Sequence, residues 1–122
     1  MTPDKHTLTK SELLSGKKDI QELFTRGSSF YSGSLRIIWL KNSANTRVLF
    51  AVPKRNHKKA VIRNKLKRRL REAYRLHKMR LPENIHYDIA YIYTSRRVRL
   101  YQDIEHDMIL SLETLANENN EN

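Results

Sequence analysis

The 122-residue chain contains no cysteine, only three glycines and three prolines, and no apolar run long enough to span a membrane. The absence of cysteine excludes disulfides and thiolate metal sites, and it favours a cytoplasmic protein without a membrane partner. The first residues are polar and lack the apolar segment of a signal peptide. Because no repeat and no linker divides the chain, we predict one domain over residues 1–122, with a flexible tail at about residues 116–122.

Acidic residues are scarce where basic residues are concentrated. Residues 54–80 carry 13 lysines and arginines but one acid, Glu72, whereas the rest of the chain has 11 basic and 12 acidic residues. The net charge of +11 therefore arises entirely within this segment. A protein that is basic only for solubility has no reason to separate its charges in this way. A polyanion that docks on one surface would favour such a separation.

Hydrophobic periodicity predicts three helices and three strands in the order α-β-β-α-β-α. The helices are expected over residues 17–26, 60–79 and 101–115, and the strands over residues 35–41, 46–53 and 87–93. A turn over residues 42–45 should join the first two strands. The third strand is apolar on both sides, which is typical of a central strand covered by helices. We therefore expect an α+β protein, a small sandwich of helices around one sheet.

The second predicted helix has aliphatic residues along one side and cations along the other. Arg63, Lys67, Arg71 and Arg75 recur at a spacing of four, so they form one ridge. Neighbouring like charges destabilise a helix by a few tenths of a kcal/mol per pair. A phosphate backbone would offset this repulsion, and counterion release would drive its binding. The ridge therefore indicates a nucleic-acid-binding surface. Because it is nearly all cation, it suits recognition of backbone and shape, which favours RNA over DNA.

Two other interpretations of the basic helix remain open. The cations could form a solvated helix face, or the helix could lie on a membrane or bind a calmodulin-like partner. Solvated faces usually mix charges of both signs, and this one does not. The apolar side is needed for the core of the domain, which disfavours a membrane. RNA is the favoured interpretation.

Residues for acid–base or metal chemistry are not grouped in the sequence. Among five histidines, only His57 lies in the basic segment, without a second histidine nearby. Asp103, Glu105 and Asp107 could hold a metal, but acids at the start of a helix are favoured by its dipole. We expect no catalytic residue and no metal site in the protein.

Aromatic residues have two possible roles. Phe30 and Tyr31 before the first strand, and Tyr91 and Tyr93 within the third, could stack on bases or pack in the core. By periodicity alone, Phe24 in the first helix is also a core candidate.

The basic segment also carries a family resemblance. Residues 54–75 read KRNHKKAVIRNKLKRRLREAYR, which resembles the signature of the bacterial ribonuclease P protein component. That family has paired bases at a strand end, a short loop, Ala-Val, and a helix with Arg-Asn-Arg followed by Arg-Glu-Ala. Residues 23–27, LFTRG, resemble the end of its first helix. Lys65 departs from the motif by replacing its second arginine, which keeps the charge but loses bidentate geometry. Further departures are the pair Val52-Pro53 before the paired bases and a longer loop at residues 56–59.

The resemblance implies a fold and a function. The fold would contain a left-handed β-α-β crossover through the basic helix, although such connections are nearly always right-handed. The partners would be the catalytic RNA subunit and precursor tRNA, with no further protein required. Magnesium ions at the RNA would perform hydrolysis, and the protein would assist removal of the 5′ leader from precursor tRNA. The alternative is a ribosomal or RNA-chaperone type of binding module, which shares the charge pattern but not the motif.

The resemblance also assigns two groups of site residues by position. The group facing the RNA subunit comprises Arg63, Asn64, Lys65, Lys67, Arg68, Arg71 and Arg75. The group binding the single-stranded leader, in a cleft between the first helix and the sheet, comprises Phe24, Tyr31, Lys54 and Arg55.

Overall fold

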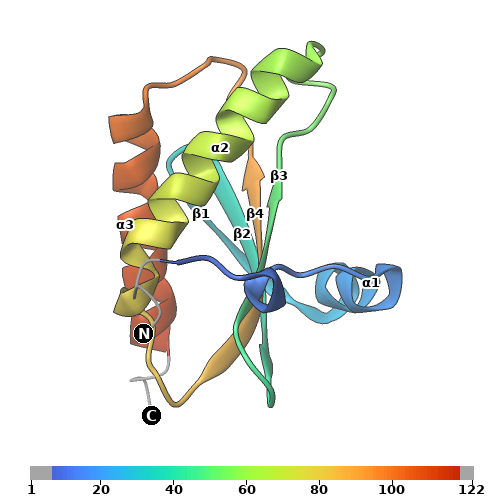
Figure 1. The fold of residues 1–122 in the computed structure, drawn as a ribbon, viewed down its shortest axis with the longest axis vertical. Helices are drawn as coiled ribbons and strands as arrows, with labels where there is room; N and C mark the ends of the chain where they lie inside the picture. Colours follow the sequence, from blue (N-terminus) through green and yellow to red (C-terminus); the bar gives the residue numbers. More distant parts are fainter. Residues whose placement is uncertain (1–6, 119–122) are drawn as a thin grey trace.

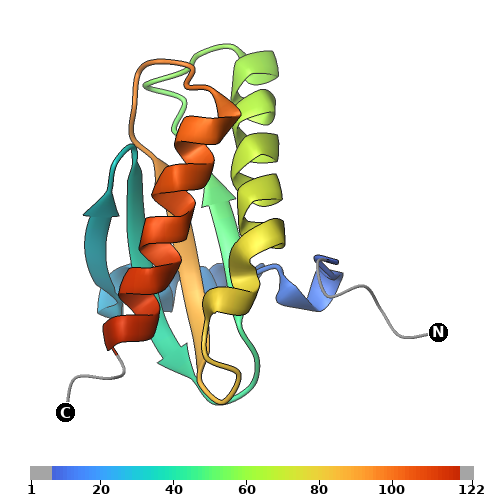
Figure 2. The same ribbon diagram turned by 90° about the vertical axis from the view of Figure 1, so that its left-hand side faces the viewer.

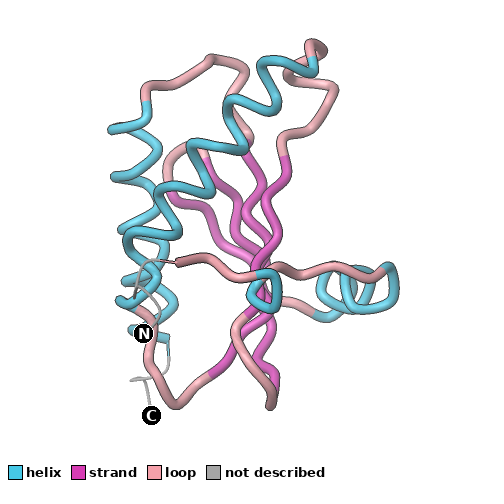
Figure 3. Tube along the Cα trace, in the orientation of Figure 1, coloured by secondary structure: helices cyan, strands magenta, loops and turns pink. Residues whose placement is uncertain are grey.

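One four-stranded sheet with helices on both faces organises the chain (Figures 1 and 3). The computed structural model describes residues 7–118. Its helices are α1 (Lys17–Arg26), α2 (Ala60–His77) and α3 (Tyr101–Glu118), and its strands are β1 (Ser28–Ser32), β2 (Leu35–Asn42), β3 (Arg47–Ala51) and β4 (His86–Tyr93). Within residues 7–118, no helix combines the length and the apolar character that a membrane crossing requires.

The predicted α+β class is confirmed, with small shifts at the ends of the elements. Helix α1 has the predicted bounds, and α2 ends at His77 and is followed by a 3₁₀ turn over Lys78–Arg80. Helix α3 continues to Glu118, so residues 116–118 are helical and do not belong to the predicted tail. Residues 119–122 lie outside the described part of the chain.

Strand β1 was not predicted, so the observed order is α-β-β-β-α-β-α. Its sequence, SSFYS, is rich in serine and lacks the apolar alternation that marked the other strands. It forms by pairing antiparallel with β2 through a two-residue turn. Gly33 in that turn has a φ of 55°, and a Cβ there would collide with the carboxylate of Asp107.

The sheet order is β1-β2-β4-β3, so β4 lies between the two strands that the predicted turn was expected to join. Strand β4 runs antiparallel to β2 and parallel to β3. The connection β3-α2-β4 is therefore a crossover between parallel neighbours. Seen from the side of α2 with both strands running upward, β4 lies to the left of β3, which makes the crossover left-handed (Figure 2). This agrees with the handedness implied by the resemblance.

The two faces of the sheet are covered unequally. Helices α2 and α3 lie on one face, where they bury the larger core (Figure 1). The aromatic rings of Tyr91 and Tyr93 are fully buried there, so both tyrosines are core residues and cannot stack on bases. Burial raises the pKa of Tyr91, which keeps its phenol neutral. On the opposite face, α1 packs Leu23 against Ile38 and Ala90 in a smaller core.

Candidate RNA interface

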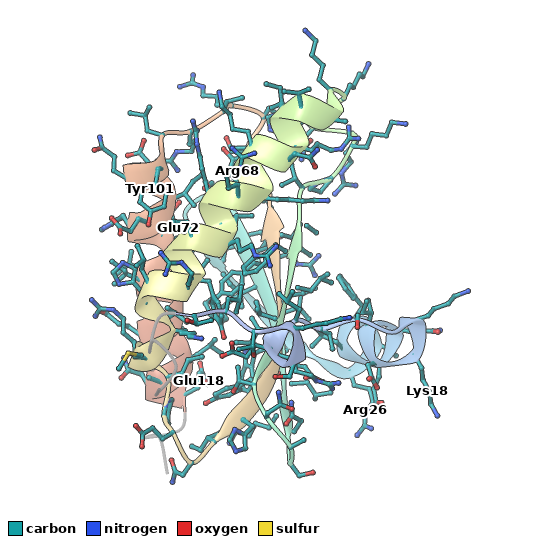
Figure 4. All side chains as sticks on the ribbon, viewed as in Figure 1. Lys18, Arg26, Arg68, Glu72, Tyr101 and Glu118 are labelled. Atoms are coloured by element: carbon teal, nitrogen blue, oxygen red, sulfur yellow. The ribbon has the colours of Figure 1, made fainter. Side chains whose placement is uncertain are left out.

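Helix α2 presents its cations to solvent because its apolar side packs against the sheet and α3. Leu66, Leu70, Ala73 and Tyr74 are buried on the inner side. Five of the seven residues predicted to face RNA are exposed: Asn64, Lys65, Lys67, Arg68 and Arg71. Figure 4 shows Arg68 in the middle of α2, one turn before Glu72.

The two ends of the cationic ridge are held by the protein itself. One Nη atom of Arg63 donates to the carbonyl oxygens of His57 and Lys58, at 2.9 and 2.7 Å. Arg75 forms an ion pair with Glu72, with a nitrogen–oxygen distance of 2.7 Å. Hydrogen bonding from Arg75 lowers the pKa of the Glu72 carboxyl, so this acid stays ionised. Contacts within the protein therefore offset part of the repulsion at both ends of the ridge.

The middle of the ridge borders a hollow beside the edge strand β3. The hollow has a volume of about 360 Å³, and it is lined by Phe50, Asn64, Lys67, Arg68 and Arg71. Phe50 comes from β3 and the other four from α2. Sequence periodicity identified Phe50 only as a strand residue, because its position beside the cations depends on the crossover.

The face of the sheet that carries α1 has a row of side chains beyond the helix. Tyr31, Arg36, Ile92 and Ala51 are successive register partners across the four strands. Tyr31 is 68% exposed, and the other three are half-buried. The neighbouring row, which includes Ile38, is covered by α1. Ile92 also packs against the core on the α1 side, so this row, the open row, is partly accessible to a ligand.

Phe24 lies in the last turn of α1, the helix that packs on the row next to this one. Its side chain is 45% exposed, whereas that of Leu23 is fully buried, so Phe24 is a surface residue. A Cβ at Gly27 would come within 2.9 Å of Ile38, so the glycine allows the end of α1 to lie close against β2. Two residues along β2 separate Ile38 from Arg36, about 7 Å in a strand. The end of α1 that carries Phe24 therefore lies on the same face of the sheet as Tyr31.

Lys54 and Arg55 follow the end of β3 and are both exposed. Arg55 lines a hollow of about 450 Å³ at the carboxyl ends of β3 and β4. Ile92 lines the same hollow, which links Arg55 to the open row. The side chain of Lys54 does not line it.

Two further arginines belong to this face and were missed by sequence reasoning. Arg36 lies within the open row, and its Nε is buried without a hydrogen-bond partner among residues 7–118. Arg96 lines the hollow beside Arg55. The signals that could have found them were a cation inside the apolar run of β2 and the arginine pair Arg96-Arg97 after β4.

The candidate acid–base and metal residues have structural partners. His57 is buried, and its Nε2 lies 2.8 Å from the carbonyl oxygen of Ser95. Asp107 accepts hydrogen bonds from the backbone and side chain of Ser34, and it forms an ion pair with Arg99. Within the described residues, no three histidines or acids are grouped as metal ligands.

Comparisons with known proteins agree over most of the chain. A family model described as Ribonuclease P matches residues 8–115. The ribonuclease P protein component of Porphyromonas gingivalis is 32% identical, over 94% of this chain and 90% of the relative. That of Chlorobium phaeobacteroides is 37% identical over 75% of each. The RNase P protein of Thermotoga maritima is 25% identical with a TM-score of 0.73, covering 84% of this chain and 96% of that one. The Staphylococcus aureus protein, at 23% identity, has the same fold with a TM-score of 0.73 over 88% of this chain and 100% of its own.

Proposed function

Since the chain belongs to the family of ribonuclease P protein components, we propose that it binds a catalytic RNA subunit through α2 and the 5′ leader of precursor tRNA through the opposite face of the sheet. In this proposal the protein assists the removal of the leader in the cytoplasm. The observation that carries it is the separation of two cationic surfaces by the sheet.

The surface of α2 suits an RNA backbone. Lys67, Arg68 and Arg71 are exposed within little more than one helical turn. Arginine forks can grip phosphate oxygens in two places, and released counterions would drive the association. Arg63 and Arg75, which have protein partners, would support the surface at its ends.

The face that carries α1 suits a single strand. The exposed rings of Phe24 and Tyr31 can stack on bases without reading their sequence. Arg36 and Arg55 would supply donors to phosphates between stacked bases. Arg36 is half-buried within the open row, and its Nε has no hydrogen-bond partner among residues 7–118, so the protein itself does not account for this cation.

The chemistry would belong to the RNA. Histidine and acidic side chains near the two surfaces are engaged in structural contacts. Magnesium bound at the RNA would activate the attacking water and stabilise the leaving oxygen. The protein would contribute substrate binding and orientation.

Purification of the tagged protein from its native cell, followed by sequencing of the bound RNA, tests this function. We expect the RNA subunit of ribonuclease P to be the main species, accompanied by precursor tRNAs that keep their leaders. Recovery of ribosomal RNA or of mixed transcripts without the RNA subunit would instead support a general RNA-binding module.

A further inference from the structure

The hollow between β3 and α2 combines an aromatic ring with one amide and three cations: Phe50, Asn64, Lys67, Arg68 and Arg71. We propose that it is a nucleotide pocket, which takes one unpaired base of the RNA subunit stacked on Phe50. This inference rests on the proposed function, because it names a subsite on the surface assigned to the RNA subunit.

Phe50 lies at the outer edge of an aromatic cluster. Its ring is nearly parallel to that of Tyr91, with an interplanar angle of 15° and a centroid distance of 6.0 Å. It also meets Tyr74 edge-on, at 5.8 Å. Both tyrosines are buried, whereas Phe50 is half-buried and lines the hollow. A base on Phe50 would extend the cluster from the core to the surface, and stacking of this kind accepts any base.

The rim of the hollow supplies contacts for the rest of a nucleotide. Asn64, Lys67, Arg68 and Arg71 are exposed, and none has a hydrogen-bond or ion-pair partner within residues 7–118. The three cations can reach the phosphates on either side of an extruded base. The Asn64 amide both donates and accepts, as pairing with a base edge requires. A surface that bound only phosphates would need neither the ring nor the amide.

The charge of the lining restricts the occupant. The hollow is lined by no carboxylate among residues 7–118, and it opens on the row of α2 cations. A base flanked by phosphates fits this lining, because the base can contact Phe50 and Asn64 while the phosphates contact the three cations. An extruded nucleotide is also the element that proteins recognise most readily in folded RNA, because double-helical RNA hides its base edges.

Two substitutions of Phe50 separate stacking from packing. Phe50→Leu removes the ring but keeps an apolar side chain against Tyr91, whereas Phe50→Tyr keeps the ring. Binding to the RNA subunit, transcribed in vitro, is measured over a range of salt concentrations. We expect Phe50→Leu to weaken binding roughly 5- to 150-fold, the equivalent of about 1–3 kcal/mol for one stacked base. The salt dependence should not change, since no phosphate contact is lost. Phe50→Tyr should bind like the wild type.

Phe30→Leu is the matched control. Phe30 is half-buried on β1, at the opposite edge of the sheet, and packs against the same core. It should bind the RNA subunit normally, and thermal unfolding reports the stability of all three variants. Chemical probing of the RNA with dimethyl sulfate, at saturating protein, should find an unpaired base that the wild type protects and Phe50→Leu leaves reactive.

Normal affinity of Phe50→Leu would overturn the pocket. An equal loss of affinity in Phe50→Leu and Phe50→Tyr would also overturn it, because the aromatic ring would then not explain the binding. Either result leaves the proposed function intact if the wild type binds the RNA subunit with a steep salt dependence. A wild-type protein that did not bind the RNA subunit would overturn both.

Discussion

Arg36 is unusual among the residues of the sheet because a cation interrupts the apolar run of β2. Its register partners are Tyr31 on one side and Ile92 on the other, and its Nε has no hydrogen-bond partner among residues 7–118. A buried donor without a partner costs about 1–3 kcal/mol of stability. Packing alone therefore does not explain this arginine, and in the proposed function its guanidinium would contact a phosphate of the leader.

Replacing Arg36 with glutamine should weaken binding of precursor tRNA that carries a leader by about tenfold, or 1.4 kcal/mol, in the reconstituted holoenzyme. Binding of mature tRNA and assembly with the RNA subunit should not change. Lys41→Gln is the control, since it removes an exposed cation near the far end of the same strand. If Arg36→Gln unfolds at a much lower temperature than the wild type, the arginine instead supports the fold.

Phe24 allows a similar test of stacking. Phe24→Leu keeps an apolar side chain beside the buried Leu23 but removes the exposed ring. We expect binding of a precursor with a leader of several nucleotides to weaken by about 1–3 kcal/mol, the contribution of one stacked base. A precursor with a one-nucleotide leader should bind almost as before. If the affinity for both precursors falls by the same factor, Phe24 does not contact the leader.

At the scale of the element, α2 differs along its length. Arg63 joins its first turn to the preceding loop, and near its other end Arg75 is paired with Glu72 of the same helix. Its middle carries cations without protein partners in the described part of the chain, including Lys67 and Arg71. The central cations are therefore the ones that the proposed function assigns to contact with RNA.

Lys67→Gln should therefore act through electrostatics. It should flatten the dependence of RNA-subunit affinity on salt by about one unit of logarithmic slope, as expected for one lost phosphate contact. Stability should not fall, because one charge leaves a row of like charges. Lys18→Gln is the matched control, since Lys18 is an exposed lysine on α1, across the sheet from α2 (Figure 4). Equal slopes for both variants and the wild type would place the RNA on another surface.

At the scale of the whole molecule, the sheet separates two surfaces of similar charge. Helix α2 lies on one face and α1 on the other (Figure 1), and the open row of Arg36 is on the face of α1. In the proposed function, the RNA subunit and the leader would therefore bind on opposite faces and would not compete. Such an arrangement suits a protein that bridges an RNA catalyst and its substrate.

Protein rigorously freed of RNA should not cleave precursor tRNA, whereas protein with its RNA subunit should do so at modest magnesium concentration. The physical reason is that His57 and Asp107, two side chains capable of acid–base or metal chemistry, are held in structural hydrogen bonds. Cleavage is measured by release of the 5′ leader. Magnesium-dependent release by the RNA-free protein would contradict this assignment of the chemistry.

The sequence by itself determined the three helices, the basic side of α2 and the class of the fold. These features depend on residues a few positions apart, so hydrophobic period and charge report them directly. The family motif, which spans the loop and α2, is likewise continuous in the chain. For the same reason, helical spacing alone places Arg63, Lys67 and Arg71 on one side of the helix.

The tertiary structure decided which strands are neighbours and therefore which residues share a surface. Strand β1 is stabilised by pairing with β2 rather than by its own serine-rich sequence. The insertion of β4 between β2 and β3 aligns Arg36 with Ile92, and the crossover brings Phe50 beside α2. Such contacts join segments far apart in the chain, and no local period encodes them. The rows and hollows that could bind RNA therefore depend on the order of the strands in the sheet.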